Sequence, residues 1–196
     1  MAQLTIIRHG ETEWSRDHRH TGRTDIPLTP TGEEQARAAG KLVADRDFAL
    51  VLVSPLRRAR ATAVLAGLPD TGLDPDIMEW DYGGYEGLTT PQIRETVPGW
   101  YLWRDGVVSG DADHPGEQVS DVGARVDRVL ERVRPVLDAG DDVALVAHGH
   151  VLRVLTARWL GLPPADGRLF ALATAGVSDL GFEHGEPVMT AWNRRG

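Results

Sequence analysis

The sequence predicts an α/β fold of three layers (α/β/α), in which a mostly parallel sheet lies between two layers of helices. Two apolar runs, Leu4–Ile7 and Val143–Ala147, have the composition of strands buried on both faces of a parallel sheet. Segments with helical spacing of apolar residues alternate with such runs along the chain. We therefore expect one domain over residues 1–196, with residues 80–118 as an irregular, aromatic-rich insertion over the site.

The other elements follow from local signals in chain order. Thr29 followed by Pro30 is typical of an N-cap and a first helical turn, so we expect a helix after a polar loop at residues 11–28. The clearest amphipathic helix spans residues 119–137, where valine and leucine recur on one face and Gly140 ends the pattern. The remaining expected elements are a strand at 49–53, helices at 55–65, 91–97 and 152–160, and strands at 169–173, 177–183 and 188–192.

Composition excludes several classes of protein. Twenty-one basic against 29 acidic residues give a net charge of −8, which does not favour nucleic acid as a partner. The absence of cysteine excludes disulfides, thiolate catalysis and cysteine-ligated zinc. No apolar run approaches the roughly 20 residues that cross a bilayer, and residues 1–4 do not have the pattern of a signal peptide, so we expect none. We expect a cytoplasmic protein that does not bind a membrane.

Two histidines occupy equivalent positions, His9 and His148, each directly after an apolar strand and before a glycine. Ligands bind at the carboxyl ends of strands in such sheets, so we expect both imidazoles at one site. A single histidine there would more often be a core residue, but a matched pair favours function. Arg8 precedes His9, and a guanidinium suits the bidentate geometry of phosphate. The pair therefore predicts an anion site.

A zinc site is the alternative for these histidines, with Glu79 or Asp81 as a further ligand. The fixed positive charge of Arg8 opposes a bound cation. We therefore expect neither a metal nor a cofactor.

A second basic element follows the strand at 49–53 and contains Arg57, Arg58 and Arg60. A solvated helix face is the usual explanation for such arginines, but cations are disfavoured by the dipole at a helix N-terminus, and a bound phosphate would account for their presence there. The spacing does not show which arginine faces the site.

The acidic candidates lie among tryptophan and tyrosine residues, in a segment that contains Glu79, Asp81 and Glu86. Aromatic surroundings desolvate a carboxyl group and favour its protonated form, which suits a general acid. Composition does not choose among the three.

Taken together, these motifs resemble the histidine phosphatase superfamily, also called the phosphoglycerate mutase-like family, and they occur in the family's order over most of the chain. The motifs are Arg8-His9-Gly10-Glu11-Thr12, Thr21-Gly22, Asp25-Ile26-Pro27-Leu28-Thr29, Ser54-Pro55-Leu56-Arg57-Arg58-Ala59, Glu79 with Tyr82-Gly83 and Glu86-Gly87, and Ala147-His148-Gly149.

The resemblance implies a role for each matching residue. His9 would be the nucleophile that forms a phosphohistidine, and Glu79 would be the proton donor. Arg8, Arg58 and His148 would bind the phosphoryl group. The further substrate-binding residues that it implies are Ser15, where the family often has asparagine, and Thr21, Gly22, Tyr82 and Gly149.

A narrower branch of acid phosphatases and sugar-bisphosphate phosphatases is similar in further details, and it also carries serine at the place of Ser15. The shared segments are Thr12-Glu13-Trp14-Ser15, Glu79-Trp80-Asp81-Tyr82-Gly83, Trp103-Arg104-Asp105-Gly106, His148-Gly149-His150 and Leu152-Arg153. This likeness suggests that Arg104 meets a distal phosphate or carboxylate of the substrate, although a surface salt bridge explains it equally well.

The prediction is a metal-independent phosphomonoester hydrolase that acts on small phosphorylated metabolites. A phosphoglycerate mutase is the first alternative, but family mutases carry a longer basic insertion, whereas residues 88–118 hold two arginines against five acidic residues. A relative that only binds phosphorylated ligands is the second alternative. The final strands offer an edge at which two copies could pair, so a homodimer stays open.

Overall fold

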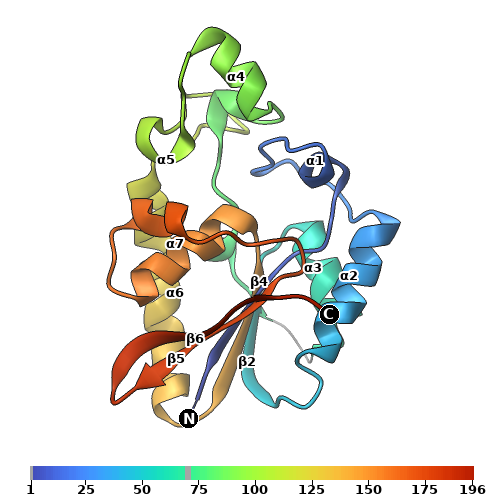
Figure 1. Ribbon diagram of the computed structural model, residues 1–196, viewed down its shortest axis with the longest axis vertical. Coiled ribbons are helices and arrows are strands. Elements are labelled where there is room, and N and C mark those ends of the chain that lie inside the picture. Colours follow the sequence, from blue (N-terminus) through green and yellow to red (C-terminus); the bar gives the residue numbers. More distant parts are fainter. Residues whose placement is uncertain (1, 69–71) are drawn as a thin grey trace.

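The computed structural model describes residues 2–68 and 72–196, in which a six-stranded sheet lies between helices (Figure 1). The strand order is β3-β2-β4-β1-β5-β6. β3, β2, β4 and β1 are mutually parallel, whereas β5 pairs antiparallel with both β1 and β6, so the sheet is mixed. The strands are β1 (Leu4–Arg8), β2 (Phe48–Val53), β3 (Gly72–Leu73), β4 (Asp142–Ala147), β5 (Val177–Glu183) and β6 (Glu186–Arg194). The expected α/β class is confirmed.

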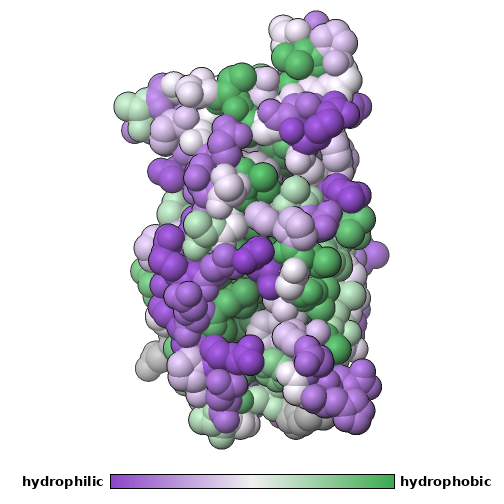
Figure 2. Space-filling model, turned by 90° about the vertical axis from the view of Figure 1, so that its left-hand side faces the viewer, coloured by the Kyte–Doolittle hydropathy of each residue, from purple (hydrophilic) through white to green (hydrophobic). Residues whose placement is uncertain are grey.

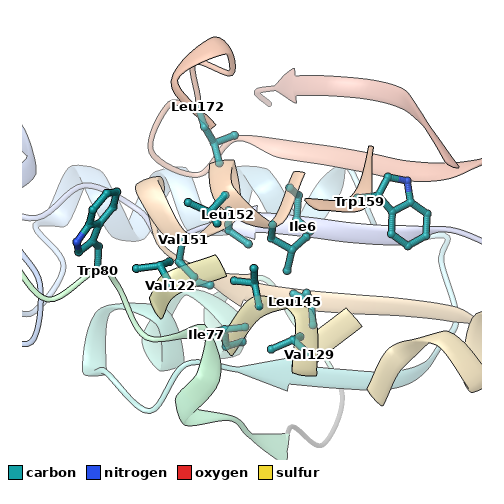
Figure 3. Close-up of a cluster of buried hydrophobic side chains, with 14 of the residues drawn as sticks. Ile6, Ile77, Trp80, Val122, Val129, Leu145, Val151, Leu152, Trp159 and Leu172 are labelled. Carbon is teal, nitrogen blue, oxygen red and sulfur yellow. The ribbon is translucent and has the colours of Figure 1, made fainter. Parts of the chain in front are cut away.

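Alternation along the two central strands separates two helical layers. Ile6 and Leu145 belong to one buried cluster, whereas Ile7 and Val146, the next residues along each strand, belong to another. Successive side chains of a strand point to opposite faces, so each cluster lies on one face of the sheet. The larger cluster includes α6 (Val119–Asp138) and α7 (Gly149–Trp159), as Figure 3 shows, and the smaller one includes α2 (Pro30–Lys41) and α3 (Arg57–Leu65).

The insertion expected at residues 80–118 lies in the connection from β3 to α6, which passes the carboxyl ends of the central strands (Figure 1). The regular elements of this connection are short: α4 (Thr90–Thr96), α5 (Leu102–Asp105) and two 3-10 turns, Pro75–Ile77, which precedes the insertion, and Gly83–Tyr85. It forms the lobe that projects at the top of Figure 2. The short helix α1 (Glu13–Arg16) lies in the loop expected at residues 11–28.

Three expected elements differ in the structure. The helix after Ser54 begins at Arg57, and α7 begins at Gly149 rather than at residue 152. The strand expected at 169–173 is wrong, because a 3-10 helix occupies Pro164–Leu169. The carbonyl oxygens of Ala171 and Leu172 then accept hydrogen bonds from the side chains of Trp192 and Arg8, and not from a neighbouring strand. β3 was not expected, because two residues carry no periodicity.

In the described part of the chain, no helix is both long and apolar enough to cross a membrane. β6 forms an edge of the sheet, and a homodimer at that edge stays a prediction.

Candidate active site

A cavity of about 190 Å³ opens where β1 and β4 end. β1 and β4 are paired in register, with Arg8 opposite Ala147, so the histidines that follow lie side by side. Five parts of the chain form its walls: the end of β1, the loop at residues 15–21, the segment that contains Glu79 and Tyr82, the first turns of α7, and Leu172. The lining residues are Arg8, His9, Ser15, His18, Arg19, His20, Thr21, Glu79, Tyr82, Gly149, His150, Arg153 and Leu172.

His9 is buried, with 5% of its surface exposed, and lines this cavity. Its Nδ1 lies 2.6 Å from the carbonyl oxygen of Gly10. A carbonyl oxygen only accepts hydrogen bonds, so Nδ1 carries the hydrogen and Nε2 keeps its lone pair. Burial, with the charges of Arg58 and Arg8, lowers the pKa of His9 well below its ordinary value. His9 is therefore a neutral imidazole with an available nucleophilic nitrogen.

His148 lies beside His9, with 5.2 Å between the ring centroids, but its surroundings differ. Its Nδ1 accepts a hydrogen bond from Nε of Arg58 at 3.1 Å, so its hydrogen is on Nε2. That Nε2 donates to the hydroxyl of Ser54 at 2.7 Å. Burial and then Arg58 lower the pKa of His148 well below its ordinary value. Both rings are neutral, and both nitrogens of His148 are engaged.

Other atoms approach the glycines of both His-Gly pairs, so closely at Gly10 that no side chain fits and tightly at Gly149. A Cβ at Gly10 would lie 2.2 Å from the carbonyl oxygen of Gly32. A Cβ at Gly149 would lie 3.2 Å from Cζ of Arg8, so the start of α7 packs directly on this guanidinium. The repeated sequence pattern therefore has a steric cause at both strand ends.

Arg58 is the arginine of the second basic element that contacts His148; it is fully buried, while Arg57 and Arg60 are exposed. Arg58 and His148 lie behind His9 and do not themselves line the cavity. Its Nη atoms donate to the carbonyl oxygens of Thr24 at 3.0 Å, Gly22 at 2.8 Å and Thr21 at 3.3 Å. Burial lowers the pKa of Arg58 from its ordinary value. The loop at residues 21–24 thus holds Arg58 against His148.

Arg8 supplies a guanidinium to the cavity wall. Its Nη1 donates to the carbonyl oxygen of Leu172 at 2.6 Å, and its buried Nε has no hydrogen-bond partner in the described residues. Burial lowers the pKa of Arg8 from its ordinary value. A buried donor without a partner is costly, so an anion in the cavity would satisfy Arg8.

Glu79 is the carboxylate that lines the cavity. Its Oε1 accepts from the backbone N–H groups of Trp80 and Val151, both at 2.9 Å, and its Oε2 accepts from that of His150 at 3.0 Å. Two of these donors belong to the first turn of α7, where the helix dipole favours negative charge. The aromatic neighbours in the sequence do not reveal these three N–H donors, two of which come from a segment about 70 residues away.

The other two carboxylates have structural partners. Asp81 is fully buried, lies 3.2 Å from Nε of Arg23 and accepts from the N–H of Gly83. Glu86 accepts from the N–H groups of Gly22 and Thr24. Of the three carboxylates, Glu79 therefore lines the cavity, whereas Asp81 and Glu86 hold other parts of the chain.

A zinc site finds no support in this geometry. Within residues 2–68 and 72–196, no three histidine, aspartate or glutamate side chains lie together as metal ligands. Glu79 faces three N–H donors, and His9 faces two guanidiniums rather than a set of carboxylates.

The remaining predicted binding residues differ in their placement. Ser15 and Thr21 line the cavity, although the Ser15 hydroxyl donates to the carbonyl of Thr12 and the Thr21 hydroxyl to that of Arg19. Tyr82 lines it too, with its hydroxyl 2.5 Å from Nδ1 of His150, and burial raises the pKa of Tyr82 well above its ordinary value. Gly22 does not line the cavity. Its N–H donates to the carboxylate of Glu86, and its carbonyl oxygen accepts from Arg58.

Arg104 is not brought to the cavity. Its side chain is 66% exposed and pairs with Asp105 at 2.7 Å, so the alternative of a surface salt bridge holds.

Sequence reasoning missed several cavity residues, above all Arg153, Arg19 and His20. Arg153 stacks on the ring of Trp103 at 4.7 Å and donates from Nε to the carbonyl of Gly167 at 3.0 Å. Burial lowers the pKa of His20 to about 4. Gly149 and Arg153 are four residues apart on α7, and this spacing on one helix face was the available signal for Arg153.

Comparison with known proteins agrees with this geometry. A model of the histidine phosphatase superfamily (branch 1) matches residues 4–195. The chain belongs to this superfamily. The resemblance inferred from the sequence motifs is thereby confirmed.

Several relatives of this histidine phosphatase are named. It is 44% identical over 185 residues to an acid phosphatase of Mycobacterium tuberculosis, covering 93% of this chain and 88% of the relative. It is 35% identical to sedoheptulose 1,7-bisphosphatase of Saccharomyces cerevisiae, covering 80% and 67%. A solved structure of an open reading frame product of M. tuberculosis superposes with a TM-score of 0.91, at 41% identity and coverage of 99% and 98%.

Proposed function

We propose that this histidine phosphatase hydrolyses phosphomonoesters without a metal ion, through a phosphohistidine at His9. The observation that carries the proposal is a neutral His9 whose free Nε2 lines a cavity beside the partly unsatisfied guanidinium of Arg8. An uncharged imidazole nitrogen is a good nucleophile, and the guanidinium supplies the charge that a phosphoryl group requires.

In the first step, Nε2 of His9 attacks phosphorus and the bond to the ester oxygen breaks. Glu79 enters this step as the neutral acid, although its three N–H donors favour the carboxylate, and gives its proton to the leaving alkoxide, so the alcohol departs neutral. Charge accumulates on the three equatorial oxygens of the phosphoryl group, where Arg8, Arg58 and His148 stabilise it. His148 contributes by moving its Nε2–H from Ser54 to a phosphoryl oxygen.

In the second step, Glu79 is a carboxylate and takes a proton from water as the water oxygen attacks phosphorus. The bond between phosphorus and Nε2 breaks, inorganic phosphate leaves, and His9 and Glu79 return to their starting states. Because the first step requires protonated Glu79, we expect the highest activity on the acid side of neutrality.

The insertion favours hydrolysis over the mutase reaction named for a relative in Gloeobacter violaceus. Its two arginines within residues 88–118 do not line the cavity: Arg104 pairs with Asp105, and Nε of Arg94 donates to the carbonyl of Trp100. The segment therefore does not bring to the cavity the basic side chains that the longer insertion of family mutases carries.

We infer further that the substrates are small metabolites with a second anionic group. Arg153 and Arg19 line the cavity, and neither forms an ion pair with a carboxylate in the described residues. Burial lowers the pKa of Arg153 from its ordinary value. A substrate with a phosphate at one end and a phosphate or carboxylate at the other would give this buried guanidinium an anionic partner.

The reaction is tested by release of inorganic phosphate from p-nitrophenyl phosphate and from a panel of phosphorylated metabolites, with EDTA present. We expect activity to persist in EDTA and a ³²P label, stable to base and labile to acid, to be trapped on His9. Loss of activity in EDTA would refute the mechanism, and binding without turnover would indicate a relative that only binds its ligand. Formation of 2-phosphoglycerate from 3-phosphoglycerate and 2,3-bisphosphoglycerate would indicate the mutase.

The substrate class is tested by Arg153→Ala, with Arg104→Ala as the control. For a sugar bisphosphate we expect KM to rise about 10-fold or more in Arg153→Ala, because a charged hydrogen bond is lost. KM for p-nitrophenyl phosphate, which has no second anionic group, should change little. Arg104→Ala should leave both values unchanged, and an equal rise for both substrates in Arg153→Ala would refute this assignment.

A further inference from the structure

Glu79 lies in a segment without regular secondary structure, between the 3-10 turn Pro75–Ile77 and the 3-10 turn Gly83–Tyr85. A proton donor on such a segment needs support from elsewhere, because an error of about 1 Å in its position can cost about 100-fold in rate. The structure supplies that support from the last residues of the insertion and from α6.

Arg125 of α6 holds the chain on the N-terminal side of Glu79. Its Nη1 donates to the carbonyl oxygens of Asp76 and Met78, both at 2.7 Å. The side chain is buried, with 8% of its surface exposed. One guanidinium nitrogen thus bridges two carbonyls that are two residues apart, and the second belongs to the residue directly before Glu79.

Glu117 holds the chain on the C-terminal side. Its Oε2 accepts from the N–H of Asp81 at 2.9 Å, and its own N–H donates to the carbonyl of Asp81 at 3.0 Å. The indole Nε1 of Trp80 donates to the carbonyl oxygen of Glu117 at 2.8 Å. The two residues after Glu79 are therefore both bound to Glu117.

Arg125 and Glu117 are also bound to each other. Nε of Arg125 donates to Oε1 at 2.8 Å, and Nη2 donates to Oε2 at 3.1 Å, in a bidentate pair with both side chains mostly buried. The guanidinium of Arg125 thus makes four contacts. Two hold the chain before Glu79, and two hold Glu117, which in turn holds the chain after Glu79. Bidentate pairs of this kind fix geometry as well as charge.

We propose that Arg125 and Glu117 are positioning residues for Glu79, and that their pair sets the efficiency of proton transfer to the leaving group. This inference rests on the proposed function. Arg128 lies on the same helix but does not have this role. It donates to the side-chain carboxylate of Asp76 and to a carbonyl of its own helix, and not to the backbone on either side of Glu79.

The test compares two leaving groups in Arg125→Met, Glu117→Gln and the control Arg128→Met. Glycerol 2-phosphate needs protonation of its alkoxide, whereas p-nitrophenolate leaves as a stable anion. For glycerol 2-phosphate we expect kcat/KM to fall about 10- to 100-fold in Arg125→Met and Glu117→Gln, and for p-nitrophenyl phosphate by less than about 3-fold. Arg128→Met should leave both substrates unchanged.

An equal loss for both substrates would show that the pair only stabilises the fold and would overturn the inference, as would no loss in either variant. Glu117→Gln keeps one amide oxygen that can accept from Asp81, and it removes the charge and one of the two acceptors of Arg125, so it provides the answer if Arg125→Met does not fold. Failure of the proposed function has a different signature, because wild-type protein would then trap no phosphate on His9.

Discussion

His9 and His148 have the same local sequence and end as chemically different groups. Each follows an apolar parallel strand, precedes a glycine and is held neutral by burial and by arginine. His9 uses one nitrogen for the adjacent carbonyl of Gly10 and presents the other to the cavity. His148 is fully buried and gives one nitrogen to Arg58 and the other to Ser54.

The difference shows that the role of a histidine depends on the partner of its second nitrogen. A backbone carbonyl fixes the hydrogen of His9 on Nδ1 and leaves Nε2 as a nucleophile. The guanidinium of Arg58 fixes the hydrogen of His148 on Nε2 and makes that ring a donor. Two neighbouring imidazoles can therefore divide the work of attack and charge stabilisation without either becoming charged.

The largest expected effect is that of His9→Ala. Removal of the nucleophile should lower kcat by at least about 10⁴-fold and abolish the trapped phosphoenzyme, because no other group reaches phosphorus. The measurement is phosphate release together with ³²P labelling. Residual labelling in His9→Ala would contradict the different roles of the two histidines, since it would make His148 a nucleophile as well.

The next effect is that of His148→Ala, which we expect to lower kcat about 100-fold through loss of one donor to the phosphoryl group. The label should still form on His9, only more slowly, and rapid-quench measurement of its formation rate checks this. Complete loss of labelling in a folded variant would contradict the division of roles.

A smaller effect is expected for Ser54→Ala, which removes the acceptor of His148 Nε2–H in the resting site. One neutral hydrogen bond is worth about 1 kcal/mol, so kcat should change by about 10-fold or less. Arg58 still donates to Nδ1, which keeps the hydrogen of His148 on Nε2. A loss as large as that of His148→Ala would show that Ser54 fixes the tautomer instead.

The pH dependence tests the shared neutrality of the two rings. Because the pKa of His9 lies well below 6.5, the nucleophile stays unprotonated as pH falls through 6.5, and kcat/KM should not decline there. A histidine of ordinary pKa would lose the reaction in that range. Titration of ¹⁵N-labelled protein should show no protonation of His9 or His148 between pH 7 and 6, and a midpoint near 6.5 for either ring would refute the assignment.

The free energy of unfolding should also depend on the neutral state of a buried histidine, and His20 is the residue for which this can be measured. Its pKa is about 4 in the folded protein and 6.5 in the unfolded chain, so below pH 6.5 the unfolded chain binds the proton first. Its contribution to the free energy of unfolding is therefore complete above pH 6.5 and falls by about 3 kcal/mol as pH drops to 4. Urea unfolding of wild type and His20→Gln should show a shallower pH dependence in the variant, and identical slopes would contradict this pKa shift.

Much of this protein is determined by sequence alone. The strands that carry His9 and His148, the long helix α6 and the N-cap at Thr29 all follow from periodicities or caps within about 20 residues. Their parallel pairing follows from the alternation of strands and helices. The sequence motifs also predicted the superfamily, because its chemistry depends on residues that directly follow strands.

Tertiary structure decided the contacts between distant segments. Arg58, not Arg57 or Arg60, meets His148 across 90 residues, and Glu79, not Asp81 or Glu86, meets the start of α7 across 72. Arg153, not Arg104, reaches the cavity. Helical or strand spacing encodes which face a side chain occupies relative to its own neighbours. The hydrogen-bond partner that gives the side chain its role is set only when remote segments pack together.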